Sequence, residues 1–207
     1  MVTNAFGKKS DNFKIYLAMV KRTNIVVIGG SAGSLKVLLV ALPLLDQGLP
    51  FPIVIIMHRK ASSDSVLNKL LAHNTKLDVI EIEDKMTMLP GCIYIVPPNY
   101  HMLFENKSLV SLDFSEKLNF SRPSIDITFR SAAEVFQECA VALLLSGANS
   151  DGVNGLKEIK SYQGTVAVQD PSTADVDYMP LQATLHVAVD IILKPIEIAT
   201  YINRLRI

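Results

Sequence analysis

The chain has 207 residues, of which 49% are hydrophobic and 19% charged, and its 20 basic residues balance its 20 acidic residues. This length suits one substantial domain, and the apolar content supports a large core and argues against disorder. A net charge of zero gives no sign of a nucleic-acid groove or of an anionic membrane surface as a target. No apolar run reaches the roughly 20 residues of a membrane helix.

Residues 1–23 are predicted to form an N-terminal arm ahead of the folded part of the chain. The first 22 residues hold five basic side chains against Asp11 alone. The longest apolar run of the arm, 13–20, is short and contains a lysine, which argues against a signal peptide. Cys92 and Cys139 lack the spacing of metal ligands, and two reduced cysteines are typical of a cytoplasmic protein. We therefore expect a cytoplasmic protein with no metal or cofactor.

Beyond the arm, short apolar runs typical of buried strands alternate with segments whose apolar residues recur every three or four positions, as in amphipathic helices. The predicted strands are 24–28, 53–57, 77–82, 92–96, 140–145, 165–168 and 191–193. The predicted helices are 35–45, one that follows the capping residues Ser62, Ser63 and Asp64, then 125–136 with Ser124 as its cap, 152–162 and 196–205. This alternation predicts an α/β fold: a doubly wound, mostly parallel sheet in a single domain, residues 24–207. A β-hairpin over 102–105 and 109–112 is expected as an insertion at the edge of the sheet.

The first strand ends in the sequence Gly29-Gly30-Ser31-Ala32-Gly33, which fits the pattern G-x-S-x-G. That pattern forms a tight strand-to-helix turn that exposes a serine hydroxyl above a sheet. Such a turn needs backbone angles that a β-carbon would obstruct. The nearby N–H groups at the start of the helix carry partial positive charge, which can stabilise an oxyanion. Ser31 is therefore a candidate nucleophile.

Two further residues are predicted at the same edge of the sheet, where ligands of open α/β proteins bind. His58 directly follows the strand 53–57, and Asp151 lies a few residues beyond the strand 140–145. Acyl transfer uses a hydroxyl, a base that activates it and a carboxylate that orients the base. The order serine, histidine, aspartate differs from that of the α/β-hydrolases, in which the histidine comes last.

Each of these residues also has a plainer interpretation. Ser31 could cap its helix, His58 could bond to a backbone carbonyl, and Asp151 could cap the helix 152–162. The three remaining histidines are interpreted as surface or core-edge residues: His73, His101 and His186. Dinucleotide binding is disfavoured, because G-x-G-x-x-G cannot be placed on the glycines at 29–33 and no Walker-type Gly-Lys-Ser/Thr occurs.

Several separate motifs, in the same order, resemble the catalytic domain of the bacterial chemotaxis receptor methylesterases, CheB. The resemblance covers nearly everything from Asn24 to Leu205. Its pieces are 28–33, the strand that ends at His58, 90–98, Arg122-Pro123-Ser124-Ile125-Asp126, 129–133, the loop 146–152, Gln169-Asp170 and Met179-Pro180.

The resemblance implies a serine hydrolase that removes methyl esters from glutamates of chemotaxis-type receptors and deamidates certain glutamines. Ser31 falls at the family's nucleophile, His58 at its base and Asp151 at its orienting acid. The backbone N–H groups around Ala32 and Ala148 fall where the family builds its oxyanion site. The implied partners are methylated receptor helices, with no nucleic acid and no insertion into a membrane.

The chain departs from the family pattern in two motifs and in the length of chain before its first strand. It has Ser31-Ala32-Gly33-Ser34 where Ser-Thr-Gly-Gly is usual, and Gly147-Ala148-Asn149 where Gly-Met-Gly is usual. A backbone donor survives a change of side chain, so the departures bear on rate and pocket shape. Only about 23 residues precede the first strand. We therefore expect no N-terminal receiver domain, and either constitutive activity or regulation by a separate protein.

Two other functions remain open from the sequence. The unusual loop at Ala148-Asn149 would also suit a weakly active or inactive relative that binds a receptor or signalling partner. The missing receiver domain would also suit an esterase or amidase that acts on a small molecule.

Overall fold

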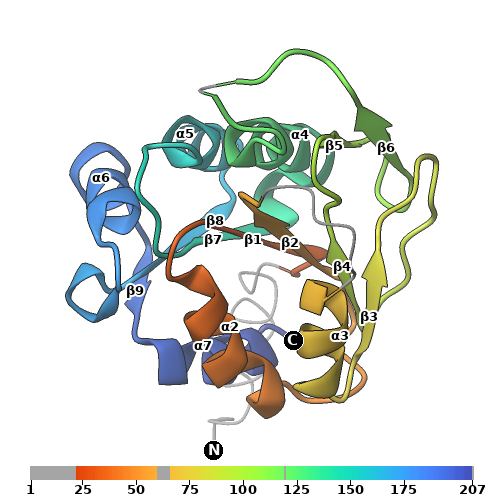
Figure 1. Cartoon of the computed structure of the whole chain (residues 1–207), viewed down its shortest axis with the longest axis horizontal. Helices are drawn as coiled ribbons and strands as arrows, with labels where there is room; N and C mark the ends of the chain where they lie inside the picture. The colour runs from red at the N-terminus through yellow and green to blue at the C-terminus, as the bar shows by residue number, and fades with distance from the viewer. Residues whose placement is uncertain (1–21, 60–65, 119, 207) are drawn as a thin grey trace, which may run out of the picture.

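The computed structural model describes residues 22–59, 66–118 and 120–206 (Figure 1). Most of the predicted arm, residues 1–21, lies outside this range, as do the capping residues predicted at 62–64. The described elements form a seven-stranded sheet in the order β3-β4-β2-β1-β7-β8-β9, with a separate two-stranded sheet of β5 and β6. The predicted α/β class is thereby confirmed.

Every neighbouring pair in the large sheet is parallel. The strands are β1 Ile25–Gly30, β2 Ile53–Met57, β3 Asp78–Glu81, β4 Cys92–Ile95, β7 Ala140–Leu144, β8 Thr165–Gln169 and β9 Ile191–Leu193. The strands β1, β2 and β7 are buried along their whole length. That burial explains their unbroken apolar sequences, since both faces of a parallel sheet are covered. At the edge, β3 is partly exposed and carries carboxylates at both ends.

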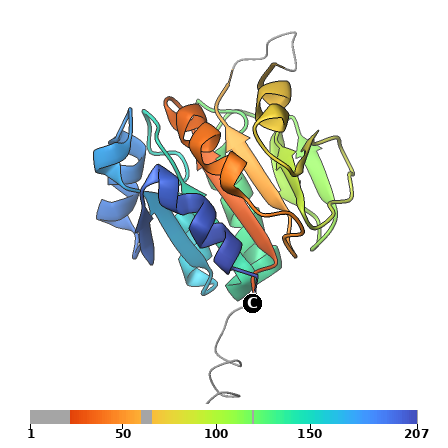
Figure 2. The same ribbon diagram turned by 90° about the horizontal axis from the view of Figure 1, so that it is seen from below.

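Helices cover the sheet on both faces (Figures 1 and 2). They are α2 Ser34–Ala41, α3 Val66–His73, α4 Ile125–Phe136, α5 Val153–Ser161, α6 Tyr178–His186 and α7 Pro195–Arg204, with 3₁₀ turns η1 Leu42–Leu44, η2 Gln137–Cys139 and η3 Pro171–Thr173. Alternate residues of β1 serve the two layers. Val27 belongs to the core beneath α4 and α5, and Val26 to the core beneath α2 and α7. The chain is thus a three-layer α/β structure.

The predicted hairpin is present, as β5 His101–Phe104 paired antiparallel with β6 Val110–Asp113. Its predicted position at the edge of the large sheet is wrong, because β5 and β6 form their own sheet. The hairpin packs on α4 instead. The N–H of Phe104 donates to Ser131 Oγ at 2.8 Å, and the rings of Phe104 and Phe136 meet edge to face at 5.0 Å. Its apolar face is buried against that helix.

Two helices differ from the sequence prediction. The helix predicted over 35–45 ends at Ala41 and continues as η1, because Pro43 has no N–H to donate to the preceding turn. The helix α6 was not predicted, since Pro180 interrupts its sequence. Proline is tolerated there because it lies in the first turn of the helix. Within the described residues, no helix is long and apolar enough to cross a bilayer.

Candidate active site

Ser31 lies in the turn that joins β1 to α2, at the carboxyl end of the central strand. Its N–H donates to Ser146 O at 2.9 Å, which ties the turn to the end of β7. The residue before α2 is Gly33, with φ +85°, and no side chain caps the helix. Among the described residues, the Ser31 hydroxyl has no hydrogen-bond partner. The alternative that Ser31 caps its helix is therefore wrong, and its half-buried hydroxyl is free to react.

The small residues of the turn allow three segments to meet around Ser31. A β-carbon on Gly30 would come within 2.5 Å of Ser34 Cβ, and one on Gly33 within 2.6 Å of Ser146 Oγ. A β-carbon on Gly147 would come within 2.7 Å of Met179 Sδ and 3.1 Å of Ser31 Cβ. A β-carbon on Gly29 would clash with Ile125 Cγ2, so both glycines of the G-x-S-x-G pattern are required by packing, and Gly33 also by its backbone angle.

His58 follows β2 and occupies the strand end next to Ser31. Gly30 pairs with Met57 in the parallel register, and the His58 N–H donates to Gly30 O at 3.2 Å. His58 Nε2 lies 2.7 Å from Asp151 Oδ2, with 13% of the histidine side chain exposed and none of the aspartate. The alternative that the His58 imidazole bonds to a backbone carbonyl is therefore wrong, because its partner is the Asp151 carboxylate.

Asp151 is buried and its carboxylate sits at the N-terminus of α4. Oδ2 accepts from the Ile125 N–H at 2.8 Å, and Oδ1 accepts from the Asp126 N–H at 3.0 Å and from Ser124 Oγ at 3.0 Å. The positive end of the helix dipole favours a carboxylate at this position. Burial alone would raise the pKa of Asp151, but the bonds from His58 and the two backbone N–H groups outweigh it and hold the pKa below its usual value. Asp151 is therefore an ionised acceptor.

An ionised Asp151 fixes the tautomer of His58. A carboxylate only accepts hydrogen bonds, so the proton of the neutral imidazole is on Nε2 and the lone pair is on Nδ1. The structure thus brings His58 and Asp151 into direct contact and puts Ser31 at the neighbouring strand end. It contains no hydrogen bond between Ser31 Oγ and the imidazole. Catalytic bonds to the nucleophile are often long without substrate and shorten when it binds.

Ala32 follows Ser31 in the turn after β1, and Ala148 lies in the loop after β7. In the part of the chain that the structure describes, neither N–H donates to a protein acceptor. Both residues are exposed. Ser146 Oγ lies 2.7 Å from Ala32 O, so the two loops are held together at their base. Within the described residues, both N–H groups are thus unpaired, and their role as oxyanion donors stays a prediction.

The site contains residues for which no role was predicted from the sequence. Asp126 Oδ1 accepts from the N–H groups of Gly152 at 2.9 Å and Gly155 at 2.7 Å, so it caps α5. Asp151, which precedes α5, caps α4 instead; the expectation that it caps its own helix is wrong. Burial raises the pKa of Asp126, and the nearby Asp151 adds to the effect. Only the Ser124 cap could be predicted, from its place before an apolar helical stripe.

A cavity of about 420 Å³ opens beside His58. Its lining includes three cationic side chains, Arg59, Lys117 and Arg122, and none of the residues that line it is acidic. Arg59 is paired with Glu81 at 3.1 Å, whereas Arg122 donates to the carbonyls of residues 114 and 115 and has an electrostatic interaction with the Asp113 carboxylate. Within the described residues, no cluster of His, Cys, Asp and Glu is arranged to hold a metal.

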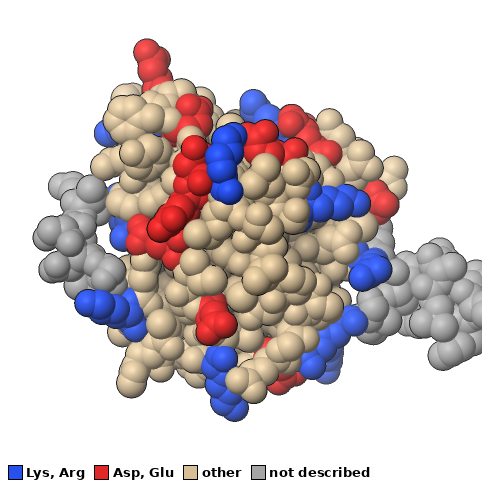
Figure 3. Space-filling model, turned by 90° about the vertical axis from the view of Figure 1, so that its right-hand side faces the viewer, with Lys and Arg blue, Asp and Glu red and all other residues tan. Residues whose placement is uncertain are grey.

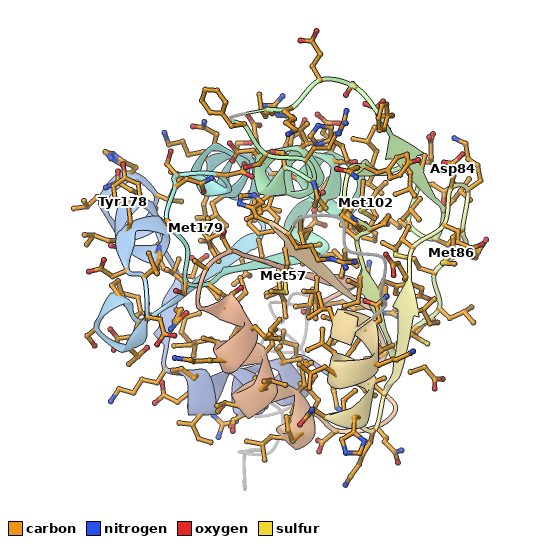
Figure 4. The ribbon with its side chains drawn as sticks, in the orientation of Figure 1. Met57, Asp84, Met86, Met102, Tyr178 and Met179 are labelled. Carbon is orange, nitrogen blue, oxygen red and sulfur yellow. The ribbon has the colours of Figure 1, made fainter. Side chains whose placement is uncertain are left out.

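One methionine packs on a loop of the site, and another adjoins His58 along the chain but lies in the core beneath α2 and α7 (Figure 4). Met57 precedes His58 at the end of β2, and Met179, at the start of α6, packs on Gly147. The N–H of Met179 also donates to Gly147 O at 2.9 Å, so α6 supports the loop that carries Ala148.

A second cavity, of about 590 Å³, has the opposite charge. Its lining includes Glu81, Glu83 and Asp84, and it shares no residue with the cavity beside His58. Figure 3, which presents the side of the molecule formed by β3 and β6, shows acidic side chains gathered on this face. The electrostatic character of the surface therefore changes sign across the Arg59–Glu81 ion pair.

Comparison with known proteins places this geometry in a family. The sequence model of the family described as CheB methylesterase matches residues 26–202. A protein of Leptospira interrogans, provisionally named protein-glutamate methylesterase/protein-glutamine glutaminase, is 41% identical over 87% of this chain and 93% of its own length. The Thermotoga maritima protein-glutamate methylesterase/protein-glutamine glutaminase is 36% identical over 75% of this chain, but the match spans only 46% of that enzyme.

A solved structure agrees with this assignment. The crystal structure of the Thermotoga maritima CheB methylesterase catalytic domain superposes with a TM-score of 0.84 at 33% identity, and covers 88% of this chain and 98% of that one. Fold, sequence and the order of the motifs therefore agree. The chain belongs to the CheB methylesterase family.

Proposed function

We propose that this protein hydrolyses the methyl esters of glutamate side chains on chemotaxis-type receptors, and that it also deamidates glutamine side chains. The observation that carries the proposal is the 2.7 Å contact between His58 and the buried, ionised Asp151, at the strand end next to Ser31. The names of the relatives from Leptospira interrogans and Thermotoga maritima support the same activities.

In this proposal the reaction begins with proton transfer from Ser31 Oγ to His58 Nδ1, the nitrogen that Asp151 leaves with a lone pair. Ser31 Oγ attacks the ester carbonyl, and the imidazole becomes cationic beside the Asp151 carboxylate. The carboxylate stabilises that cation and keeps the ring oriented without taking the proton itself. The negative charge that develops on the carbonyl oxygen is stabilised by the N–H groups of Ala32 and Ala148.

The tetrahedral intermediate collapses when His58 gives its proton to the leaving oxygen, and methanol departs. An acyl-enzyme between Ser31 and the glutamate side chain remains. Water then attacks with His58 as base, and the glutamate carboxylate is released as Ser31 regains its proton. A glutamine side chain follows the same route with ammonia as the leaving group.

The cavity beside His58 indicates the kind of partner. Its cationic lining suits a protein segment with carboxylates near the ester, such as a receptor helix on which some glutamates are methylated and others are free. Phe120, with 97% of its surface exposed, stands at the cavity as an apolar contact for such a segment. We propose methylated receptor helices as the partner, with residues 24–207 as the catalytic unit and a separate protein as a regulator.

We also propose that the protein works in the cytoplasm. The cysteines Cys92 and Cys139 are both free, which is typical of proteins in a reducing compartment.

The test is labelling with a fluorophosphonate, which reacts with an activated serine. We expect stoichiometric labelling at Ser31, located by peptide mass spectrometry, and no labelling in Ser31→Ala or His58→Ala. Failure of the folded wild-type protein to label would contradict the proposal and favour a binding module. Turnover of simple esters without turnover of methylated receptor fragments would contradict the proposed substrate and favour a small-molecule esterase.

A further inference from the structure

The position of the acid Asp151 depends on the first turn of α4, and a buried histidine holds that turn. His101, the first residue of β5, is fully buried. Its Nδ1 lies 3.1 Å from the Ser124 N, and its Nε2 lies 3.0 Å from Glu116 O. Because a backbone N–H can only donate, Nδ1 is the acceptor and the proton is on Nε2, which donates to the Glu116 carbonyl. Both nitrogens of His101 are therefore used.

Ser124 carries this constraint to the active site. Its hydroxyl donates to Asp151 Oδ1 at 3.0 Å and accepts from the Ile127 N–H at 3.4 Å as the cap of α4. Asp151 Oδ2 in turn accepts from His58 Nε2 at 2.7 Å. His101 thus bonds to the N–H of Ser124, and the hydroxyl of the same Ser124 bonds to Asp151. Asp151 in turn bonds to His58, so the four residues are linked in series. His101, Ser124 and Asp151 are each at most 1% exposed.

Because these residues are buried, each hydrogen bond in the series needs its protein partner. If the acceptor His101 Nδ1 were lost, water could not replace it at this buried position. The Ser124 N–H would then be buried without a hydrogen-bond partner, which is costly. The first turn of α4 would then shift until that N–H found another acceptor. Because the Ile125 and Asp126 N–H groups in the same turn donate to Asp151, the carboxylate would move with it.

We infer that His101 is a positioning residue, which fixes the orientation of Asp151 toward His58 through Ser124 and the start of α4. The inference rests on the proposed function, because it takes Asp151 as the group that orients the base. His101 does not touch the substrate. It contributes by holding the Asp151 carboxylate in the position from which that carboxylate stabilises the cationic form of His58.

Two substitutions separate the bonds of His101. His101→Asn can keep an acceptor near the Nδ1 position for the Ser124 N–H, but loses the bond to Glu116 O. His101→Gln can keep a donor near the Nε2 position for Glu116 O, but offers no acceptor to Ser124. Thr128→Val is the matched control. Thr128 is buried one turn further along α4, and its hydroxyl donates to Met102 O in β5 at 3.1 Å, with a longer contact of 3.5 Å to Ser124 O, so it links the same two elements without a bond to Asp151.

The first measurement is the low-field proton NMR signal of the His58 Nε2–H that bonds to Asp151, assigned by its loss in His58→Ala and Asp151→Ala. We expect the signal in wild type, His101→Asn and Thr128→Val, and its loss or a large upfield shift in His101→Gln. This signal reports the geometry of the pair without any substrate.

The second measurement is kcat and KM for methanol release from a methylated receptor fragment. We expect His101→Gln to lower kcat about 10- to 100-fold with little change in KM, because misplaced catalytic groups slow the chemical step. His101→Asn should retain most of the wild-type kcat. An unchanged signal or an unchanged kcat in folded His101→Gln would overturn the inference. The absence of methanol release by wild type would instead contradict the proposed function, while the NMR comparison would still decide the role of His101.

Discussion

At the scale of single residues, the site depends on which atoms are left without partners. Asp151 receives hydrogen bonds on both oxygens, yet none of its partners is a fixed positive charge. The bond from His58 and the bonds from the backbone N–H groups hold the pKa of Asp151 below its usual value, and His58 can gain and lose a proton without a competing cation on the carboxylate. Ser31 Oγ and the N–H groups of Ala32 and Ala148 are, by contrast, free of protein partners in the described residues. The carboxylate that orients His58 is therefore fully bonded, whereas the proposed nucleophile and the two proposed oxyanion donors are not bonded within the described residues.

Replacement of Asp151 by asparagine tests the role of its charge. Asp151→Asn keeps the shape of the side chain but removes the carboxylate that stabilises the imidazole cation. The kcat for ester hydrolysis should fall by about 10⁴-fold, the size of effect expected when a triad loses its acid. Steady-state kinetics on folded protein measures this. A fall of less than tenfold would mean that the contact between His58 and Asp151 is structural.

At the scale of elements, α4 and α5 exchange their N-terminal caps. Asp151, just before α5, binds the first N–H groups of α4, and Asp126, in α4, binds those of α5. Neither helix start is complete without the other. The close approach of the helices at Gly155 makes the exchange feasible, because a β-carbon there would lie 2.5 Å from Phe129 Cβ and 3.0 Å from Asp126 O.

A methyl group at Gly155 should therefore separate the two helices. Gly155→Ala is expected to lower the free energy of unfolding by about 1–3 kcal/mol, as overpacking commonly does. It should also reduce activity, because Asp126 and Asp151 would move apart with their helices. The control is Asn154→Ala, at an exposed position on the same helix, which should leave the free energy of unfolding and the activity unchanged. Urea unfolding gives the comparison, and equal stability of the two variants would contradict this account of the contact.

The two carboxylates should affect stability in opposite ways as pH changes. The pKa of Asp126 is raised by burial, so its native state holds the proton more tightly than the unfolded chain does, and its contribution to stability falls as pH rises through the native pKa. The pKa of Asp151 is lowered, so its contribution is present above the unfolded value and is lost as pH falls through the native pKa.

Urea unfolding across a pH series measures both contributions. Relative to Asp126→Asn, wild type should lose stability as pH rises. Relative to Asp151→Asn, wild type should gain stability as pH rises from the native pKa of Asp151 to the unfolded pKa of about 4. Differences of the same sign for both variants would contradict the assignment of these shifts.

At the scale of the whole molecule, much of the architecture followed from periodicity, but the support of the site did not. The strands β1, β2 and β7 have unbroken apolar runs, as expected of strands buried on both faces of a sheet, and the residues that follow them include the candidates Ser31, His58 and Asp151. The partners Asp126 and His101 come from an α-helix and a hairpin far away in sequence. Their contacts with the site depend on how these elements pack, so no local sequence pattern predicts those contacts.

The same limit applies to the hairpin and to α6. An alternating apolar pattern predicts a strand pair but cannot say which surface it covers, and β5 and β6 cover α4. The sequence of α6 contains Pro180, which local rules count against a helix. Because Pro180 lies in the first turn of α6 it does not interrupt the helix, but the start of the helix is set by the packing of Met179 on the loop at Gly147, which is a tertiary contact.

Methanol release from a methylated receptor fragment tests the central claim most directly. Wild type and Ser31→Ala, purified side by side and shown by thermal unfolding to be equally folded, would be compared in the same assay. We expect wild type to release methanol and Ser31→Ala to lose at least about 10⁴-fold in kcat. Full activity in Ser31→Ala would contradict the account of Ser31 as the nucleophile.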